Sequence, residues 1–342
     1  MPIRVYTPSD FERLRTFAAE LPRHGGLAHE PFVDHYYAGS EFCRLYLFEE
    51  GGGEITGTLG IDLMRFSGRA RDWTLAFGSN FNASKPGVGG LLYLTWMKSA
   101  EAGLVFGGSA EAHALYRKEG WTYFSGVRTF VLNRPYDPSP GEGVLRRGAK
   151  RVLRRLRRPI PRRASRVPDT VRREVTVTEV PWSEDLLPED PGPFTVRFAP
   201  TLRYLEWRYG LSLPFVRYRL FRISKRGERE GYVVLNESPQ RILVAHCDGR
   251  DPRTLAWGIL LAILEVAAGD VFPRAVHLSS SHPGMQDVFL SFGFRPEVGE
   301  RPLAIGSRKV PIDLERDTSR WLVSFDWGDN GLRPPFRTEP NT

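Results

Sequence analysis

A glycine-rich turn is the first feature of the sequence that suggests ligand chemistry. It runs Ser84-Lys85-Pro86-Gly87-Val88-Gly89-Gly90 and separates a predicted strand from a predicted apolar helix over residues 91–100. Glycines let backbone N–H groups approach a ligand closely, and the N-terminus of the following helix adds unpaired donors and a favourable dipole. The turn therefore fits a pyrophosphate, with a plain connecting loop as the alternative. It is not a nucleotide P-loop, because no Lys-Ser or Lys-Thr follows its last glycine.

A tyrosine and two carboxylates are candidates for acid–base chemistry. Tyr116 lies on a predicted helix over residues 110–118, and a phenol with an ordinary pKa of about 10 suits proton donation to a thiolate of roughly similar basicity. A packing role on an amphipathic helix is the alternative. Asp62 and Glu111 are candidate general bases, each with a solvated carboxylate as the alternative, and the predicted strand over 73–78 carries no acid.

The helix and the turn together resemble the GNAT acetyltransferases. In that family a polar residue, a small residue, a tyrosine and a glycine–aromatic pair recur at fixed spacing. The corresponding places are taken here by Ser109, Ala112, Tyr116, Gly120 and Trp121. The turn is similar to the family's coenzyme A pyrophosphate loop, with Gly87 and Gly89 in the two glycine places, but Ser84 stands where the family usually has Arg or Gln.

The resemblance implies a cofactor and a reaction. The cofactor would be acetyl-CoA or another acyl-CoA, and an amine would attack the acyl thioester. Most of the rate enhancement would come from holding the two reactants in position. Tyr116 would protonate the leaving thiolate. The residues implied in cofactor binding are Ser84, Lys85, Gly87, Val88, Gly89, Gly90 and Ser109.

The order of predicted elements repeats along the chain. In the first half we expect a strand over 3–6, helices over 8–21 and 31–37, strands over 43–48, 55–64 and 72–78, a helix over 91–100, a strand over 104–107, a helix over 110–118 and strand material over 121–133. In the second half we expect a helix over 201–209, strands over 216–224, 231–236 and 241–246, a helix over 254–268, a strand over 275–279 and a short helix over 285–292. Gly57 precedes Gly120 by 63 residues, and Gly231 precedes Gly293 by 62. This spacing predicts a duplication, so the expected fold class is α/β, with a mixed sheet in each of two tandem GNAT-like domains.

The second copy lacks the features that would hold a cofactor. Its turn, over residues 247–253, has no Gly-x-Gly and carries two aspartates that oppose a pyrophosphate, and Phe289 stands in the place of the tyrosine. His246 and His282 are candidates to face a shared cleft, with a structural role as the alternative for each.

A second resemblance concerns the segment Tyr204-Leu205-Glu206-Trp207-Arg208-Tyr209. It is similar to the C-terminal halves of tandem GNAT-like proteins of bacterial polysaccharide gene clusters. The likeness implies an amino-sugar or lipid-linked saccharide acceptor, with Trp207 and Tyr209 stacked on a sugar face. Core packing of the two rings is the alternative.

Length, cysteine content and hydropathy limit the possible domain number, metal content and location of the protein. The 342 residues favour two domains, and Cys43 and Cys247 lack neighbouring His at metal-ligand spacing, so neither a disulfide framework nor a metal site is expected. The N-terminus lacks a signal-peptide core, and the most apolar stretch, 255–268, is too short to span a bilayer. We therefore expect a cytoplasmic protein, with a first domain over 1–137, a basic linker over 138–173, a second domain over 174–330 and a tail over 331–342.

The net charge of +8 belongs to one segment. Residues 144–173 hold 13 Lys/Arg and one acid, a charge of +12, which leaves 8 − 12 = −4 for the rest of the chain. An apolar stripe at helical spacing runs through this segment, at Leu145, Ala149, Val152, Leu153 and Leu156. Such a helix suits peripheral contact with an anionic membrane, with a solvated linker as the alternative. Nucleic acid is not expected as a partner, because no nucleic-acid-binding motif accompanies the charge.

These features predict an acyl-CoA-dependent N-acyltransferase that acts on an amino sugar or another small amine. Two alternatives stay open. In the first, both halves are catalytically silent and the protein is a saccharide-binding or assembly factor at the membrane surface. In the second, the protein is an aminoacyl-tRNA-dependent transferase, as known for related tandem folds.

Overall fold

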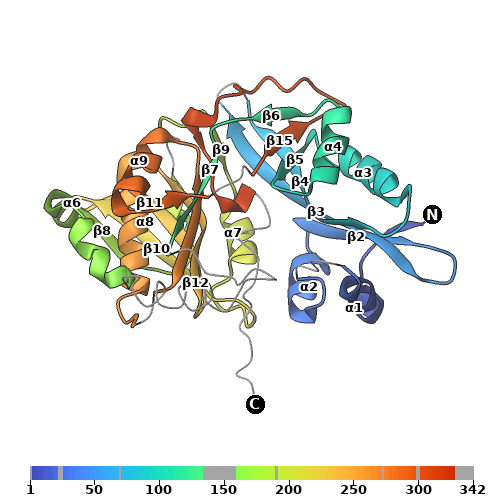
Figure 1. The fold of residues 1–342 in the computed structure, drawn as a ribbon, viewed down its shortest axis with the longest axis horizontal. Coiled ribbons are helices and arrows are strands. Elements are labelled where there is room, and N and C mark those ends of the chain that lie inside the picture. The colour runs from blue at the N-terminus through green and yellow to red at the C-terminus, as the bar shows by residue number, and fades with distance from the viewer. Residues whose placement is uncertain are drawn as a thin grey trace, which may run out of the picture.

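The chain forms two bodies, each built on a mixed β-sheet (Figure 1). The computed structural model describes residues 2–21, 26–68, 71–133, 159–188, 192–271, 273–297 and 301–327. The predicted fold class is confirmed, and most predicted elements lie within a few residues of their expected bounds.

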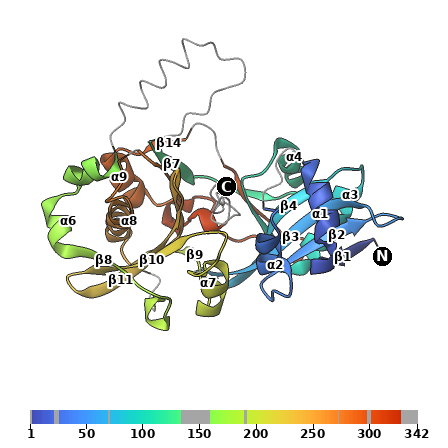
Figure 2. The ribbon, with the colours of Figure 1, turned by 90° about the horizontal axis from the view of Figure 1, so that it is seen from below.

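The first body carries helices on both faces of its sheet. In chain order its elements are β1 (Ile3–Val5), α1 (Phe11–Ala19), α2 (Glu30–Tyr37), β2 (Cys43–Glu49), β3 (Ile55–Gly68), β4 (Trp73–Ala83), α3 (Val88–Ser99), β5 (Ala102–Phe106), α4 (Ala110–Lys118) and β6 (Thr122–Phe124). Helices α3 and α4 pack on one face, and α1 and α2 pack on the other (Figure 2). The second body covers the same face as α1 and α2.

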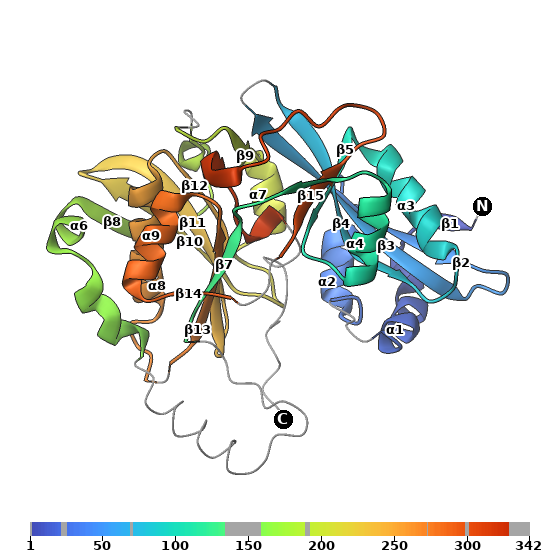
Figure 3. The ribbon, with the colours of Figure 1, turned by 45° about the horizontal axis from the view of Figure 1, so that its top comes forward.

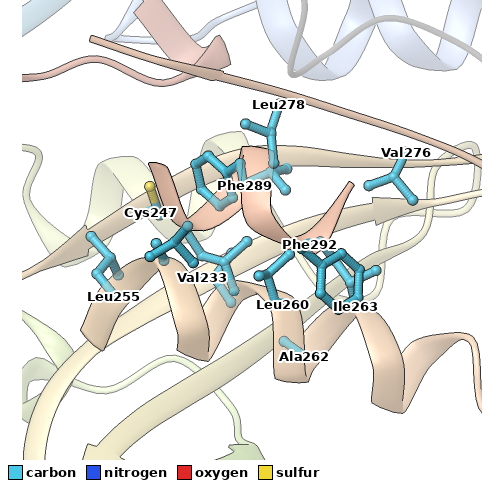
Figure 4. Packing of buried hydrophobic residues seen from close by; sticks show 14 of the residues in the cluster. Val233, Cys247, Leu255, Leu260, Ala262, Ile263, Val276, Leu278, Phe289 and Phe292 are labelled. Atoms are coloured by element: carbon cyan, nitrogen blue, oxygen red, sulfur yellow. The ribbon is translucent and has the colours of Figure 1, made fainter. Parts of the chain in front are cut away.

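The second body repeats this plan. Its elements are α6 (Asp169–Glu174), β8 (Val175–Glu179), α7 (Leu202–Arg208), β10 (Tyr218–Lys225), β11 (Glu228–Glu237), β12 (Arg241–Gly249), α8 (Pro252–Val266), β13 (Ala275–Ser280), α9 (Pro283–Phe292) and β14 (Arg295–Pro296). Its core lies between the sheet and the pair α8 and α9, where aliphatic and phenyl side chains interdigitate (Figure 4).

Each body borrows one strand from the other half of the chain. The first sheet has the order β1-β2-β3-β4-β5-β15-β6, in which β15 (Leu303–Gly306) comes from the second half. The second sheet has the order β8-β10-β11-β12-β13-β7-β14, in which β7 (Arg128–Leu132) comes from the first half. In Figure 1 the green arrow of β7 lies among the yellow and orange strands, and the red arrow of β15 lies beside β5. Each strand of the first sheet therefore has an equivalent at the same position of the second sheet, and the borrowed strand is the sixth in both.

This exchange crosses the expected division of the chain. We placed a boundary at 137–138 and another at 173–174, as if each half formed its own sheet. The last strand of the first half, β7, pairs with β13 and β14 instead. The predicted strand material over 121–133 is thus split between two sheets, because the chain turns away from the first body after β6.

A further short sheet segment joins the bodies. Strand β9 (Val196–Phe198) pairs with the end of β3, and β16 (Trp321–Leu322) pairs with β9. A 3₁₀ helix, η5 (Phe325–Trp327), follows β16 and contacts β5 of the first body and β12 of the second. No helix in the described part of the chain is both long enough and apolar enough to cross a membrane.

The exchanged strands predict that neither half folds alone. A fragment of residues 1–133 lacks β15, so β5 and β6 lose the strand that lies between them. We expect no cooperative thermal transition from this fragment by circular dichroism. Mixing it with residues 134–342 should restore one, together with a 1:1 complex on size exclusion. The intact chain is the control, and cooperative unfolding of 1–133 by itself would contradict the prediction.

Candidate functional site

The glycine-rich turn lies where β4 separates from β5. Parallel pairing between these strands ends at Phe77 and Leu104, although β4 continues to Ala83 and β5 to Phe106. Helices α3 and α4 both begin at this edge, so two helix N-termini flank the gap (Figure 3). Ligands in α/β folds bind at the carboxyl ends of parallel strands, which makes this gap the candidate site.

The turn itself leaves its backbone accessible. Gly87 has φ of +84° and precedes the first residue of α3, and a Cβ built on Gly87 or Gly90 would meet nothing within 4 Å. The first amides of a helix have no intrahelical acceptor. The predicted glycines thus form an open cradle of N–H donors, which fits a pyrophosphate.

The side chains of the turn are less available. Ser84 is held by Thr56, whose carbonyl oxygen accepts from its amide at 2.9 Å and from its hydroxyl at 3.1 Å. The Lys85 ammonium lies 2.7 Å from a carboxylate oxygen of Glu50. Val88 is buried in the core of the first body. Any contact from this turn to a ligand is therefore mainly a backbone contact.

Tyr116, on α4, lies in an aromatic cluster with Trp96 and Trp121. Its ring is 2% exposed and stacks on Trp121, with ring centroids 4.6 Å apart. Its hydroxyl makes no hydrogen bond to the described residues. Burial raises the pKa of Tyr116 above its ordinary value, so the group stays protonated at neutral pH.

The second predicted proton-transfer residue of this helix, Glu111, lies in solvent. It is in the first turn of α4, where Ser109 caps the helix by accepting from the Ala112 amide at 3.2 Å. Hydrogen bonds from its own backbone amide and from Ser109 lower the pKa of Glu111. A base weakened in this way and exposed to water is poorly suited to remove a proton from an ammonium group.

A histidine that the sequence analysis did not single out holds the start of α4. The Nε2 atom of His113 lies 3.0 Å from the carbonyl oxygen of Gly107, and its Nδ1 atom lies 2.9 Å from the Tyr123 hydroxyl. A carbonyl can only accept, so Nε2 carries the proton and Nδ1 accepts from Tyr123. Gly107 and Gly108, with φ of +89° and +122°, form the turn that this histidine fixes at the edge of the gap.

A β-bulge at residues 79–82 of β4 was also missed. Thr58 of β3 faces Asn82 and Gly60 faces Ser79, so one residue of β3 is opposite two of β4. Asn80 has φ of +47°, in the left-handed region. The predicted strand ended at residue 78. The run Ser79-Asn80-Phe81-Asn82 that follows is the signal of the bulge, since Asn tolerates this conformation better than most residues.

Asp62 is an interface residue rather than a base in the gap. Its carboxylate, 3% exposed, accepts hydrogen bonds from the Tyr204 hydroxyl at 2.9 Å and from the Arg208 guanidinium. Burial raises the pKa of Asp62, and Arg208 acts against that rise. It lies opposite Phe77 on the sheet face that the second body covers, so it cannot meet an amine from solvent in this conformation.

The four predicted acceptor residues do not line one cleft. Tyr209 is fully buried and stacks on His246, which is 1% exposed and lies 2.6 Å from a carboxylate oxygen of Asp326. Neither ring has a free face for a sugar. Trp207 donates to the carbonyl oxygen of His35 and packs between α7 and α2, and His282 caps α9 by accepting from the Gly284 amide at 3.1 Å.

The equivalent gap in the second body is filled by the chain itself. Strands β12 and β13 also separate after three residue pairs. The segment 321–327 contacts both of them, through the pair His246–Asp326 and through Ser281, which donates to the Trp321 carbonyl oxygen at 2.7 Å. Arg197 also pairs there with Asp248 at 3.2 Å. The expected loss of the second cofactor site therefore has a steric reason besides its two aspartates.

The described part of the basic segment packs against the second body. Arg166 donates to the carbonyl oxygen of Phe292 at 2.8 Å, at the C-terminus of α9, and Arg163 donates to Asn133 at 3.3 Å. Residues 144–158, which carry the predicted apolar stripe, lie outside the described residues. A membrane contact through this segment stays a prediction.

A cavity of about 380 Å³ lies at the other end of β4. Trp73, at the start of that strand, lines it together with Gly68, Val196 and Trp321. It is ten residues from the glycine turn along an extended strand, so it does not belong to the gap.

Several solved structures have a similar fold. No protein-family model matches the chain, and no curated protein matches it either. A GCN5-related N-acetyltransferase from Anabaena variabilis aligns at a TM-score of 0.56 and 10% identity, over 89% of this chain and 72% of that one. One from Kribbella flavida aligns at 0.54 and 14%, over 90% and 71%. A tandem GNAT protein from the clavulanic acid biosynthesis pathway aligns at 0.51 and 13%, over 89% and 96%.

The chain therefore has a tandem GNAT fold, and the resemblance drawn from its motifs is confirmed for the fold. At 10–14% identity the likeness concerns the fold alone.

The role of Asp62 predicts a large loss of stability on its neutralisation. Asp62→Asn removes the counter-charge of a guanidinium that has no exposed surface, and breaking a buried ion pair from one side costs about 3–5 kcal/mol. Urea unfolding would measure this loss. Asp72→Asn is the matched control, because Asp72 pairs with Arg65 in solvent and should cost less than about 1 kcal/mol. Equal effects of the two changes would contradict the buried role.

Proposed function

We propose that the first body is an acyl-CoA-dependent N-acyltransferase that transfers an acetyl group to an amino sugar or another small amine. The observation that carries the proposal is the open glycine cradle at the gap between β4 and β5. On α4, whose N-terminus flanks that gap, the Tyr116 hydroxyl makes no hydrogen bond to the described residues. The fold supports the reaction class, and the second body contributes no second cofactor site because segment 321–327 occupies the equivalent position.

The backbone of residues 87–90 and the N-terminus of α3 would hold the pyrophosphate. Charge on the ligand suits this position because the helix dipole and the free amides both favour an anion. The acyl thioester would then reach into the gap between the strands, near the bulge of β4. Acyl-CoA supplies an activated carbonyl carbon, and the protein supplies its orientation relative to the amine.

Acyl transfer forms a C–N bond and breaks the C–S bond of the thioester. The sulfur leaves as a thiolate and takes a proton from Tyr116. A tyrosine with a raised pKa is a weak acid, but the same apolar surroundings also raise the pKa of a thiol, so the two groups stay matched. The acceptor arrives as an ammonium and must lose a proton before its nitrogen can attack. Asp62 and Glu111 are poorly placed for that step, which leaves water as the acceptor, and the second proton that the nitrogen loses on forming the amide restores Tyr116.

A saccharide acceptor fits the uncharged polar groups near the bulge. Ser79, Asn80 and Asn82 are half-buried there. The side-chain amides of the two asparagines already donate within the bulge, so it is their amide oxygens and the Ser79 hydroxyl that suit hydrogen bonds from a polyol. We also retain peripheral contact with an anionic membrane through 144–158 as a proposal, on the charge of that segment alone.

The cofactor site predicts a selective effect of charge at Gly89. A Cβ at this position would lie 3.7 Å from Ala83 and meet no closer atom, so a side chain fits without disturbing the fold. Gly89→Asp should abolish acetyl-CoA binding by calorimetry, because a carboxylate repels the pyrophosphate. Gly89→Asn, of the same size but neutral, is the control and should retain more affinity. Unchanged affinity in Gly89→Asp would reject the site.

The proton donor predicts a loss of turnover without a loss of affinity. Tyr116→Phe keeps the stacking on Trp121 and removes only the hydroxyl. We expect the release of free thiol from acetyl-CoA, with glucosamine as the test acceptor, to fall by roughly 10²-fold, within the range for a lost general acid. Acetyl-CoA affinity should stay the same. Equal turnover of the two proteins would leave Tyr116 as a packing residue.

A further inference from the structure

The C-terminal end of α2 connects the second body to the first. The Nε2–H of His35 donates to the carbonyl oxygen of Trp207 at 2.8 Å. The hydroxyl of Tyr36 donates to the backbone carbonyl oxygen of Arg208 at 2.8 Å. Both acceptors lie at the end of α7 in the second half of the chain. The last turn of α2 is thus bonded to the last turn of α7.

Helix α7 is itself fixed to the sheet of the first body. Arg208 and Tyr204 both bind the carboxylate of Asp62 on β3. Strand β3 is the partner of β4 along nearly the whole length of the latter. The position of α7 relative to β4 is therefore set by buried, charge-assisted hydrogen bonds, and α2 takes its position from α7.

The next residue of α2, Tyr37, reaches the bulge of β4. Its hydroxyl oxygen accepts from the side-chain amide of Asn80 at 2.7 Å and lies 3.4 Å from the hydroxyl of Ser79. Gly60 makes room for this contact, since a Cβ there would come within 2.4 Å of Ser79 and 3.0 Å of Tyr37. Thr58 completes the arrangement by donating to the carbonyl oxygen of Asn80 at 2.8 Å.

These contacts fix a conformation that is uncommon for a residue with a side chain. Asn80 is left-handed within a strand, and residues with a side chain keep such a conformation only where their surroundings impose it. The bulge releases backbone groups of β4 from the ladder beside the gap. Its shape therefore depends on Tyr37, and through α2 on the second body.

We propose that the second body positions the acyl-binding bulge of the first, with α7 holding α2 and Tyr37 of α2 holding Asn80. Tyr37 and Asn80 are then positioning residues, and the body without a cofactor gap is a rigid support for the body that has one. This inference rests on the proposed function, because it assigns the acyl end of the thioester to the gap at the bulge.

The test compares two ligands that differ only at the acyl group. Calorimetry with acetyl-CoA and with free coenzyme A on the full chain separates the bulge from the pyrophosphate site. Tyr37→Phe and Asn80→Gly should each weaken acetyl-CoA by about 10-fold, roughly the size of one lost contact, and leave coenzyme A unchanged. A merely structural role would change both ligands or neither. Glycine at position 80 permits the left-handed backbone, so that variant removes only the side-chain contact.

The link to the second body has its own variants. Tyr36→Phe and His35→Phe each remove one hydrogen bond to α7 and keep an aromatic ring, and they should weaken acetyl-CoA selectively in the same direction. Two variants are used so that the test still gives a result if one of them does not fold. Thermal unfolding would identify folded proteins before the titrations.

Matched controls are available in the chain. Tyr46→Phe removes a hydroxyl on β2 that makes no hydrogen bond to the described residues. Asn133→Gly removes the side chain of another left-handed asparagine, with φ of +54°, outside the gap. Both should bind the two ligands as the wild type does.

The outcomes separate the inference from the function beneath it. Unchanged acetyl-CoA affinity in Tyr37→Phe and Asn80→Gly would overturn the positioning role of the contact between Tyr37 and Asn80. Selective loss there, with wild-type affinity in Tyr36→Phe and His35→Phe, would overturn the role of the second body. Wild-type protein that binds neither ligand would overturn the proposed function, and the inference with it.

Discussion

A fully buried guanidinium is the constraint around which the two bodies are assembled. Arg208 has no exposed surface, and a charge in that position is tolerated only if every donor finds an acceptor. Its partners come from three parts of the chain: Asp62 on β3, Tyr204 and Tyr209 around α7, and the carbonyl oxygen of Asp326 in η5. Moving any of these segments would leave an ion unpaired in an apolar interior. The relative placement of β3, α7 and η5 follows from that requirement.

The segment that contains η5 has different effects on the two bodies. Residues 321–327 lie between the sheets. Phe325 and Trp327 belong to the same hydrophobic cluster as Phe77 and Leu104 of the first body, and Asp326 is paired with His246 of the second. In the first body they pack on the covered face of the sheet and leave the helix N-termini at the edge of the gap open. In the second they contact both strands at the point where a cofactor would enter. One strand order thus supports an open gap and a closed one.

Much of the fold was predictable because its elements follow local rules. The helix at 110–118 was placed without error, since Ser109 is a good cap and Gly120 a good stop. The glycine turn and Tyr116 could be proposed from the sequence because their spacing is a local pattern, and their roles stay predictions. The roles of Asp62 and His246 were not found, because burial between two bodies is a long-range property. Asn80 was missed for a different reason: its polar neighbours resemble a loop, and only pairing with β3 makes them a bulge.

The exchange of β7 and β15 changes what a duplicated gene can lose. After a duplication, selection is usually free to let one copy decay, since the other retains the activity. Here the second copy supplies an internal strand, between β5 and β6, to the first sheet, so it can lose a ligand site but not its architecture. A body without an open gap is still kept under selection for packing, and its surface is free to diverge while its core is not.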